Sequence, residues 1–256
     1  MNSLIVEEVK KHFGGVVACN GPSLKAESGG ITAIIGPNGA GKTTLINLIS
    51  GVYPPDAGRI LLNNQDITKF HSTKVAQAGI ARTFQNVALF RGMTVLENML
   101  LGRTIYMKSG VLSCGLFWGP ARREEAAQRK KVEDVIDFLG ITDIRKTPVS
   151  SLPLGLQKRV ELGRALAAEP KVLLLDEPMG GMNLEEKESM ARFVLDVVEH
   201  TDTAVVLIEH DMGVIMDISD HIIVMDQGAM IAEGPPEQVQ KNPRVIEAYL
   251  GAPHAA

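Results

Sequence analysis

The stretch Gly36-Pro37-Asn38-Gly39-Ala40-Gly41-Lys42-Thr43 decides the fold of this chain, because it fits the phosphate-binding pattern G-x-x-x-x-G-K-[ST]. The apolar run 31–35 precedes it and a helical pattern over 44–49 follows, which is the context that this pattern requires. The glycines let backbone N–H groups point at phosphate oxygens, and the following helix adds the positive end of its dipole. Lys42 supplies a charge for the β- and γ-phosphates, and the Thr43 hydroxyl can ligate Mg²⁺. The sequence therefore predicts a nucleoside triphosphate site rather than a glycine-rich turn with an incidental lysine.

Length and composition are those of an ordinary globular protein. The 256 residues are 45% hydrophobic and 22% charged, enough for one large domain or for a domain with a subdomain. The net charge of −4 argues against a broad nucleic-acid-binding face. Cys19 and Cys114 give neither a disulfide framework nor a metal-binding spacing. The sequence shows no signal peptide and no apolar run long enough to cross a bilayer, so any action at a membrane would go through a partner.

Two acids follow directly after the apolar run 172–175. Ligands bind at the carboxyl ends of strands in open α/β sheets, which is where Asp176 and Glu177 would lie. A P-loop ATPase needs a carboxylate near Mg²⁺, and Asp176 fits that role. Glu177 can be aimed at the attacking water as a general base. The alternative is a strand that ends in two solvated acids, which the accompanying P-loop makes the weaker interpretation.

The order of strand and helix patterns indicates an α/β fold. Apolar runs at 171–175, 203–208 and 221–225 suit a parallel sheet covered on both faces, and the helical pattern 185–200 suits a crossover between strands. The middle of the chain differs, because a charged helix former starts near Arg122 and Gly140 fits its C-cap. We therefore predict a P-loop α/β core interrupted by a mostly helical insert.

At this point the chain resembles the ATP-binding-cassette (ABC) ATPases over essentially its whole length. The P-loop 36–43 and the segment 172–178 match the two Walker motifs of that family. Gln85 matches the Q-loop glutamine, which contacts Mg²⁺ and water in that family. His210 matches the switch histidine at the γ-phosphate, and Phe13 matches the aromatic that stacks on adenine. Residues 180–183 occupy the D-loop, which crosses a dimer interface. Each of these residues alone would have an ordinary structural explanation, and only their joint order supports the assignment.

The resemblance implies a fold, domain boundaries and a site. The fold is that of a P-loop NTPase, with a RecA-like mixed core sheet flanked by helices, an antiparallel β-subdomain and an inserted α-helical subdomain. Residues 4–85 and 169–234 form the core with its β-subdomain, 86–168 the helical signature subdomain, and 235–256 a helical tail within one domain, 1–256. The implied catalytic residues are Glu177, His210 and Gln85, and the implied metal ligands are Thr43, Gln85 and Asp176. The implied ATP-binding residues are Phe13, Gly36, Pro37, Asn38, Gly39, Ala40, Gly41, Lys42, Thr43, Thr44 and Gly155.

The signature segment departs from the family pattern L-S-G-G-Q. Pro153 replaces the serine, Leu154 the first glycine and Leu156 the glutamine, while Gly155 is retained. Proline removes both a hydroxyl and a backbone donor. We expect ATP still to be sandwiched between two cassettes, with Gly155 as the main signature contact and a helix from Gln157 through Arg164. The ATPase rate is left open, and this signature could face the weaker site of a heterodimer.

The carboxyl end points to one branch of the family. The predicted hairpin 226–234 and the closing run 242–251 look like those of the ATP-binding proteins of branched-chain amino-acid importers. The resemblance then implies the larger of two ATPase subunits, with ATP and Mg²⁺, a second ATPase subunit (homo- or heterodimer) and permease subunits that dock near 85–101. A solute-binding protein would take part indirectly, nucleic acid would not, and the chain would lie at the inner face of the cell membrane. The segment 102–120, with Tyr106, Phe117 and Trp118, is expected to be a packed loop rather than a ligand site.

Three alternatives remain at this stage. ABC ATPases of DNA repair carry long coiled coils and those of translation usually hold two cassettes, and neither feature occurs here. A weakly catalytic nucleotide-binding cassette is suggested by Pro153 and Leu156, although Glu177 and His210 are both present. Within transporters, an ATPase for another solute or for lipid export is the nearest competitor. The solute itself lies outside what this chain encodes.

Overall fold

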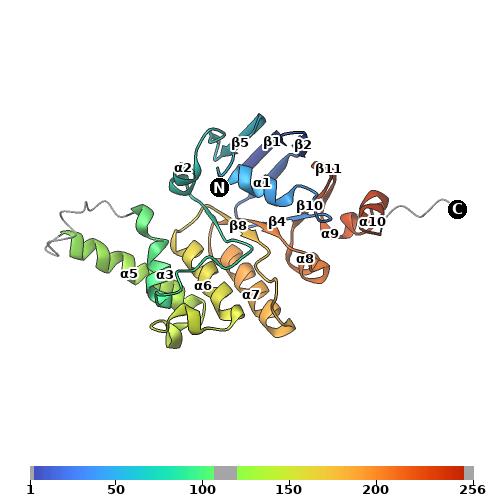
Figure 1. Cartoon of the computed structure of the whole chain (residues 1–256). Helices are drawn as coiled ribbons and strands as arrows, with labels where there is room; N and C mark the ends of the chain where they lie inside the picture. Colours follow the sequence, from blue (N-terminus) through green and yellow to red (C-terminus); the bar gives the residue numbers. More distant parts are fainter. Residues whose placement is uncertain (1–2, 107–119, 251–256) are drawn as a thin grey trace.

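Two β-sheets organise the computed structural model, which describes residues 3–106 and 120–250 (Figure 1). The larger sheet has the strand order β11-β10-β4-β9-β8-β7. Its strands pair in parallel except for the antiparallel hairpin of β10 and β11. The strands are β4 (Ile31–Ile35), β7 (Ile80–Arg82), β8 (Val172–Asp176), β9 (Ala204–Ile208), β10 (His221–Asp226) and β11 (Ala229–Gly234). The unbroken apolar runs thus form the parallel strands that the sequence predicts.

Both faces of the larger sheet are buried, which explains why its strands are apolar without alternation. In β8, Leu173 and Leu175 pack in one core cluster, while Val172 and Leu174 pack in another. The second cluster also holds α1 (Lys42–Ile49), which follows the P-loop and starts two residues earlier than its sequence pattern suggests. The strands β4 and β8 run parallel on either side of β9, so their carboxyl ends lie at the same end of the sheet. The P-loop follows β4 there, and the acidic pair lies at the end of β8.

A second, antiparallel sheet shares its core with α1. Its order is β2-β1-β5-β6, with β3 also paired to β1. The strands are β1 (Ser3–Phe13), β2 (Val16–Asn20), β3 (Leu24–Glu27), β5 (Ala57–Leu62) and β6 (Gln65–Asp66), and α2 (Ser72–Ala78) follows before β7. In β1 the buried residues Leu4, Val6 and Val9 turn toward that core, while their neighbours are more exposed. This is the antiparallel β-subdomain that the resemblance implies.

A helical part lies between β7 and β8 in the chain and gathers on the side of the larger sheet away from β1 and β5 (Figure 1). It contains α3 (Val95–Leu101), η1 (Thr104–Tyr106), α5 (Pro120–Phe138), η2 (Thr142–Ile144), η3 (Val149–Ser151) and α6 (Leu154–Ala167). Gly140 ends α5 with a φ of +61°, as its C-cap role requires. The signature helix α6 begins at Leu154 rather than at the expected Gln157, because Pro153 serves as its N-cap residue with extended backbone.

The carboxyl-terminal third completes the sheet and covers it. The helix α7 (Leu184–His200) packs in the same core cluster as α3, α5 and α6. The helices α8 (Met212–Ile218), α9 (Pro236–Val239) and α10 (Pro243–Leu250) contribute to a third cluster against β4 and β10. Among the helices of the described residues, none has the length and apolar character needed to cross a membrane. The expected fold class is confirmed, and most of the segment 102–120, including Phe117, Trp118 and Cys114, lies outside the described residues.

Candidate nucleotide-binding site

The P-loop is held between two strands at positions where only glycine fits. A Cβ on Gly36 (φ +150°) would lie 2.1 Å from the carbonyl oxygen of Met225, at the end of β10. A Cβ on Gly41 (φ +97°) would lie 2.4 Å from the carbonyl oxygen of Ala18 in β2. No side chain can be added at either position without moving backbone. The loop is therefore shaped by both sheets at once.

Lys42 folds back over the loop that precedes it. Its ammonium donates to the carbonyl oxygens of Gly36 at 2.7 Å and Pro37 at 3.0 Å, and the residue is 6% exposed. Burial lowers the pKa of Lys42, and the charges of Glu177 and Asp176 oppose that shift. The ammonium is thus positioned beside the acidic pair. The neighbouring P-loop residues Asn38, Gly39 and Thr43 are exposed, while Ala40 is buried and Thr44 is half-buried.

Asp176 presents one free oxygen at the end of β8. The residue is 1% exposed, and its Oδ2 accepts a hydrogen bond from Arg82 Nη2 at 2.8 Å. Its Oδ1 is buried and has no hydrogen-bond partner among the described residues. Carboxylate and hydroxyl oxygens are ligands that Mg²⁺ accepts, and Thr43 is an exposed residue on the first turn of α1. These residues fit a magnesium site.

The side chain of Glu177 is held from two directions. Its Oε1 lies 2.8 Å from His210 Nε2, and its Oε2 accepts a hydrogen bond from Gln85 Nε2 at 2.9 Å. Three residues from separate segments of the chain are thereby brought together in one cluster. The backbone of Glu177 adopts a φ of +51°, which is uncommon for a residue with a side chain.

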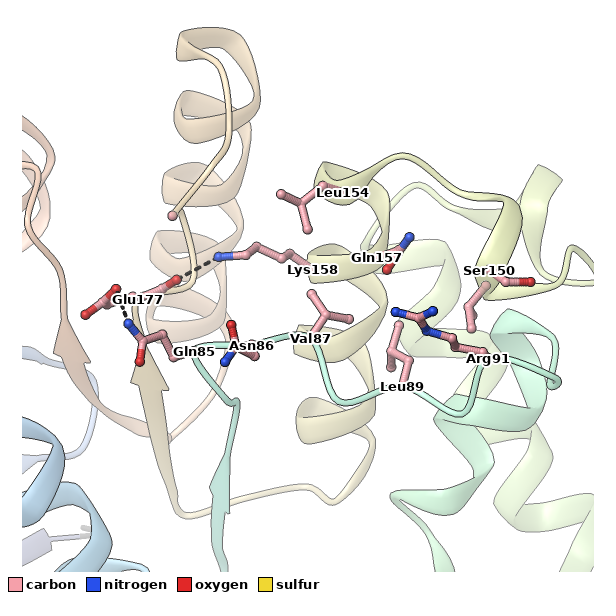
Figure 2. A pocket seen from close by; sticks show the side chains of 12 residues that line it. Gln85, Asn86, Val87, Leu89, Arg91, Ser150, Leu154, Gln157, Lys158 and Glu177 are labelled. Atoms are coloured by element: carbon pink, nitrogen blue, oxygen red, sulfur yellow. Dashed lines mark hydrogen bonds between the residues drawn. The ribbon is translucent and has the colours of Figure 1, made fainter.

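Two buried cations at this cluster were not predicted from the sequence. Lys158 of α6 donates to the carbonyl oxygen of Glu177 at 2.8 Å (Figure 2), and burial lowers the pKa of Lys158 against the charges of nearby carboxylates. Arg82 of β7 pairs with Asp176. One signal for Lys158 was available, because it lies on the buried face of α6 with Gly155 and Leu162, where a charged residue needs a partner. No local pattern marks Arg82.

The segment 84–88 around Gln85, called the Q-loop below, is held by a carboxylate of the signature helix α6. Glu161 Oε1 accepts hydrogen bonds from the backbone N–H of Phe84 at 3.4 Å and of Ala88 at 3.3 Å, and Glu161 is 2% exposed. Burial raises the pKa of Glu161, against the effect of these donors. Because these bonds join α6 to both ends of the segment around Gln85, a shift of α6 would move the glutamine.

A hollow of about 610 Å³ opens beside Glu177. Figure 2 shows Gln85 and Glu177 at one end and Arg91 and Ser150 at the other, with Lys158 reaching across from α6. Leu154, at the start of α6, lines the hollow and is 43% exposed. The hollow therefore joins the Glu177 cluster to the start of the signature helix.

Gly155 and Phe13 have different surroundings from the P-loop. Gly155 is buried against α7, because a Cβ there would lie 2.3 Å from Glu186 Oε1. Glu186 also completes a capping box with Asn183, the N-cap residue of α7. Phe13, at the end of β1, is 42% exposed and packs edge-to-face on Tyr53 with ring centroids 5.2 Å apart. A side chain at 155 would thus have to displace the Glu186 carboxylate, and Phe13 presents an aromatic side chain to solvent.

Comparison with known proteins decides the family. The family model described as ABC transporter matches residues 19–180, and that described as branched-chain amino acid ATP-binding cassette transporter matches residues 229–255. The chain belongs to the branched-chain amino acid group of ABC transporter ATP-binding proteins. As an ABC transporter ATPase, it carries both Walker motifs within the first match, and the second match covers residues 235–255 of the predicted tail.

Individual relatives of this ABC protein are similar over nearly its full length. The branched-chain amino acid transport ATP-binding protein BraF of Pseudomonas aeruginosa is 40% identical, with 97% of each chain covered. LivG of Escherichia coli K12 is 39% identical with the same coverage. The solved structure of a nucleotide-free ATP-binding cassette from an ABC transporter is 34% identical with a TM-score of 0.85, covering 98% of this chain and 100% of that one. A cassette in its ADP conformation is also 34% identical, with a TM-score of 0.84 and the same coverage.

Proposed function

We propose that this protein hydrolyses ATP with Glu177 as the general base. The observation that supports the assignment is the convergence of Gln85 and His210 on the two carboxylate oxygens of Glu177. A base fixed at both oxygens loses little freedom when it accepts a proton from water. The adjacent Lys42 ammonium would meet the β- and γ-phosphates, and the P-loop N–H groups would receive their oxygens.

Mg²⁺ would be held by Asp176, Thr43 and Gln85. The buried Oδ1 of Asp176, which has no partner among the described residues, and the exposed position of Thr43 support this assignment. When bound, the ion neutralises charge on the phosphates. Phe13 would stack on the adenine, and its exposed ring supports that role.

A second cassette would cover the hollow beside Glu177. The D-loop and the start of α6 border this face, where Leu154 and Leu184 are 43% and 72% exposed. The unpaired N-terminal N–H groups of α6, including that of Gly155, would face the nucleotide held by the other cassette. ATP would then join two copies, and hydrolysis would separate them. We propose either a homodimer or a heterodimer with a second ATPase subunit.

A permease helix would bind in an apolar groove of about 440 Å³ between α2, the Q-loop and α6. Phe84 and Phe90 line it and are 45% and 57% exposed, which is unusual for phenylalanine in a free monomer. Because the groove shares Phe84 with the Q-loop, closure of two cassettes would push a helix seated in it. The chain would thus lie at the inner face of the cell membrane, bound to permease subunits, with a solute-binding protein acting through them and no nucleic acid involved.

The solute would be a branched-chain or related amino acid. This proposal is supported by the two relatives BraF and LivG, which are high-affinity branched-chain amino acid transport ATP-binding proteins. The proposed parts of the chain are the core with its β-subdomain at 4–85 and 169–234, the helical signature subdomain at 86–168 and the tail at 235–256.

The test is a steady-state ATPase assay of the purified chain, with and without its co-purified permease. Glu177→Gln should bind ATP, lose turnover and stabilise the dimer, since the amide cannot accept the proton. Hydrolysis at the parent rate would remove Glu177 as the base. Lys42→Ala should weaken nucleotide binding, and unchanged affinity would remove the P-loop assignment.

A weakly catalytic cassette is the second candidate. It is favoured by one observation, that Pro153 gives α6 no side-chain cap where the family pattern has a serine hydroxyl. Turnover of the parent at the level of Glu177→Gln, with ATP still bound, would favour this alternative.

A further inference from the structure

We infer that Arg82 is a positioning residue that fixes the Asp176 carboxylate for Mg²⁺ and links it to the apolar groove. The inference rests on the proposed function and deepens it. Arg82 Nη2 donates to Asp176 Oδ2 at 2.8 Å, and the two side chains are 11% and 1% exposed. An arginine bond to a buried carboxylate is directional as well as charged. It occupies one oxygen of Asp176 and leaves the other, Oδ1, without a partner.

The arginine is itself anchored on the helix that follows the P-loop. Its Nη1 donates to Asn47 Oδ1 at 2.6 Å and to Ser50 Oγ at 3.2 Å, both on the last turns of α1 or just after it. The Ser50 hydroxyl donates to the carbonyl oxygen of Ile46 at 2.8 Å, so its lone pairs are free to accept from the arginine. One guanidinium thereby bridges α1 and the end of β8, which carry Thr43 and Asp176, two of the three protein ligands proposed for Mg²⁺.

The same guanidinium faces the groove. Its centre lies 5.2 Å from the centroid of the Phe84 ring, which is a cation–π contact. Phe84 lines the groove proposed for the permease helix, and it precedes Gln85 in the chain. A helix that displaces the Phe84 ring would therefore act on the residue that orients Asp176. This gives a physical route from the groove to the metal ligand that is separate from Gln85.

The experiment measures the Mg²⁺ dependence of nucleotide binding rather than turnover. Binding of a fluorescent ATP analogue is titrated with Mg²⁺ in the Glu177→Gln background, which holds hydrolysis at a minimum. We expect Arg82→Met to raise the half-saturating Mg²⁺ concentration about tenfold, with unchanged binding in the absence of Mg²⁺, because the Asp176 carboxylate loses its fixed orientation. Arg82→Lys keeps a charged donor and should stay within about threefold. Arg59→Met is the control, since that arginine is 64% exposed and pairs with Glu7.

Whether Arg82→Met raises or lowers the half-saturating Mg²⁺ concentration distinguishes a positioning role of Arg82 from a role in neutralising the charge of Asp176. If Arg82 only cancelled the charge of Asp176, its removal would tighten Mg²⁺ binding, and that result overturns the inference, as does an unchanged constant. Asn47→Ala removes the anchor of Arg82 without burying a new group, and it should raise the constant about twofold to fivefold. If Arg82→Met fails to fold, an unchanged constant in Asn47→Ala overturns the inference.

The link to the groove is tested on Phe84. Phe84→Leu should raise the Mg²⁺ constant about twofold or more, while Phe138→Leu, a partly exposed aromatic on α5, should not. Equal constants for these two variants would overturn the link. Loss of Mg²⁺-dependent nucleotide binding in the parent would instead overturn the proposed function itself, so the two failures are distinguishable.

Discussion

Replacing Lys158 by methionine should slow hydrolysis while leaving ATP binding largely intact. Lys158 is 6% exposed, and its ammonium donates to the carbonyl oxygen of Glu177 at 2.8 Å. Glu177 needs that support, since its φ of +51° is a conformation that costs about 1–3 kcal/mol for a residue with a side chain. Methionine keeps most of the side-chain volume and removes the charged donor.

The size of the effect follows from the bond that is lost. A hydrogen bond from a charged group contributes about 1.5–3 kcal/mol, and leaving the carbonyl unpaired adds to the loss. If most of this energy holds the base in place in the transition state, kcat should fall about tenfold to a hundredfold, at about 1.36 kcal/mol for each factor of ten. ATP affinity should change less than about threefold, because the residues proposed to bind phosphate within the same cassette lie in the P-loop rather than on α6.

The assay is single-turnover and steady-state ATP hydrolysis, with nucleotide binding measured on the same preparations. Lys131→Met is the matched control, since Lys131 makes its ion pair with Glu169 at the surface of the helical part and is 47% exposed. A folded Lys158→Met variant with kcat within twofold of the parent would refute the reasoning. A fall in ATP affinity as large as the fall in kcat would also refute it, because the residue would then act on binding.

Three further predictions concern Gly36 in the P-loop, the contribution of Asp56 to stability at low pH, and Phe13, which is proposed to stack on adenine. Gly36→Ala should abolish ATP binding and lower the melting temperature, because its Cβ would lie 2.1 Å from a carbonyl oxygen of β10; Gly15→Ala, with nothing within 4 Å of its Cβ, should do neither. Hydrogen bonds from the Lys11 ammonium and from the backbone N–H of His12 lower the pKa of Asp56 from 3.8 to about 2, so the stabilisation from Asp56 is complete above about pH 4 and is lost as the pH falls toward 2. Denaturant titrations of Asp56→Asn should show a flatter loss of stability over that interval than the parent, and parallel curves would contradict the assignment. Phe13→Ala should weaken binding of ATP about tenfold while changing binding of free triphosphate little; equal weakening of both would place the residue away from the base.

The core of the site could be predicted because its parts are local in the sequence. The P-loop pattern, the apolar strand before it and the two acids at the end of β8 each occupy a few consecutive residues, so periodicity and turn chemistry are sufficient to find them. The sequence pattern puts the start of α6 three residues late, because Pro153 and Gly155 both disfavour helix interiors. At a helix N-terminus neither residue carries that penalty, and only the tertiary contact with α7 reveals where the helix begins.

The cations around the acidic pair could not be predicted in the same way. Arg82 and Asp176 are 94 residues apart in the sequence and become partners only through the pairing of β7 with β8. Lys158 donates a hydrogen bond to a backbone carbonyl, and every residue has such a carbonyl, so the residue types do not identify the acceptor. Long-range pairs of this kind depend on strand order and helix packing, which the sequence constrains only through the whole fold.

The double role of Glu186 has a consequence for how two copies meet. It closes the capping box at the start of α7, and a Cβ on Gly155 would lie 2.3 Å from its Oε1, so one carboxylate lies between the starts of both helices that border the proposed interface. An interface whose helix ends are already ordered loses little conformational entropy on association. The remaining free-energy cost is the loss of translational and rotational freedom of the two cassettes. The rate at which two cassettes join should then be governed by diffusion and by nucleotide occupancy, without a slow ordering phase.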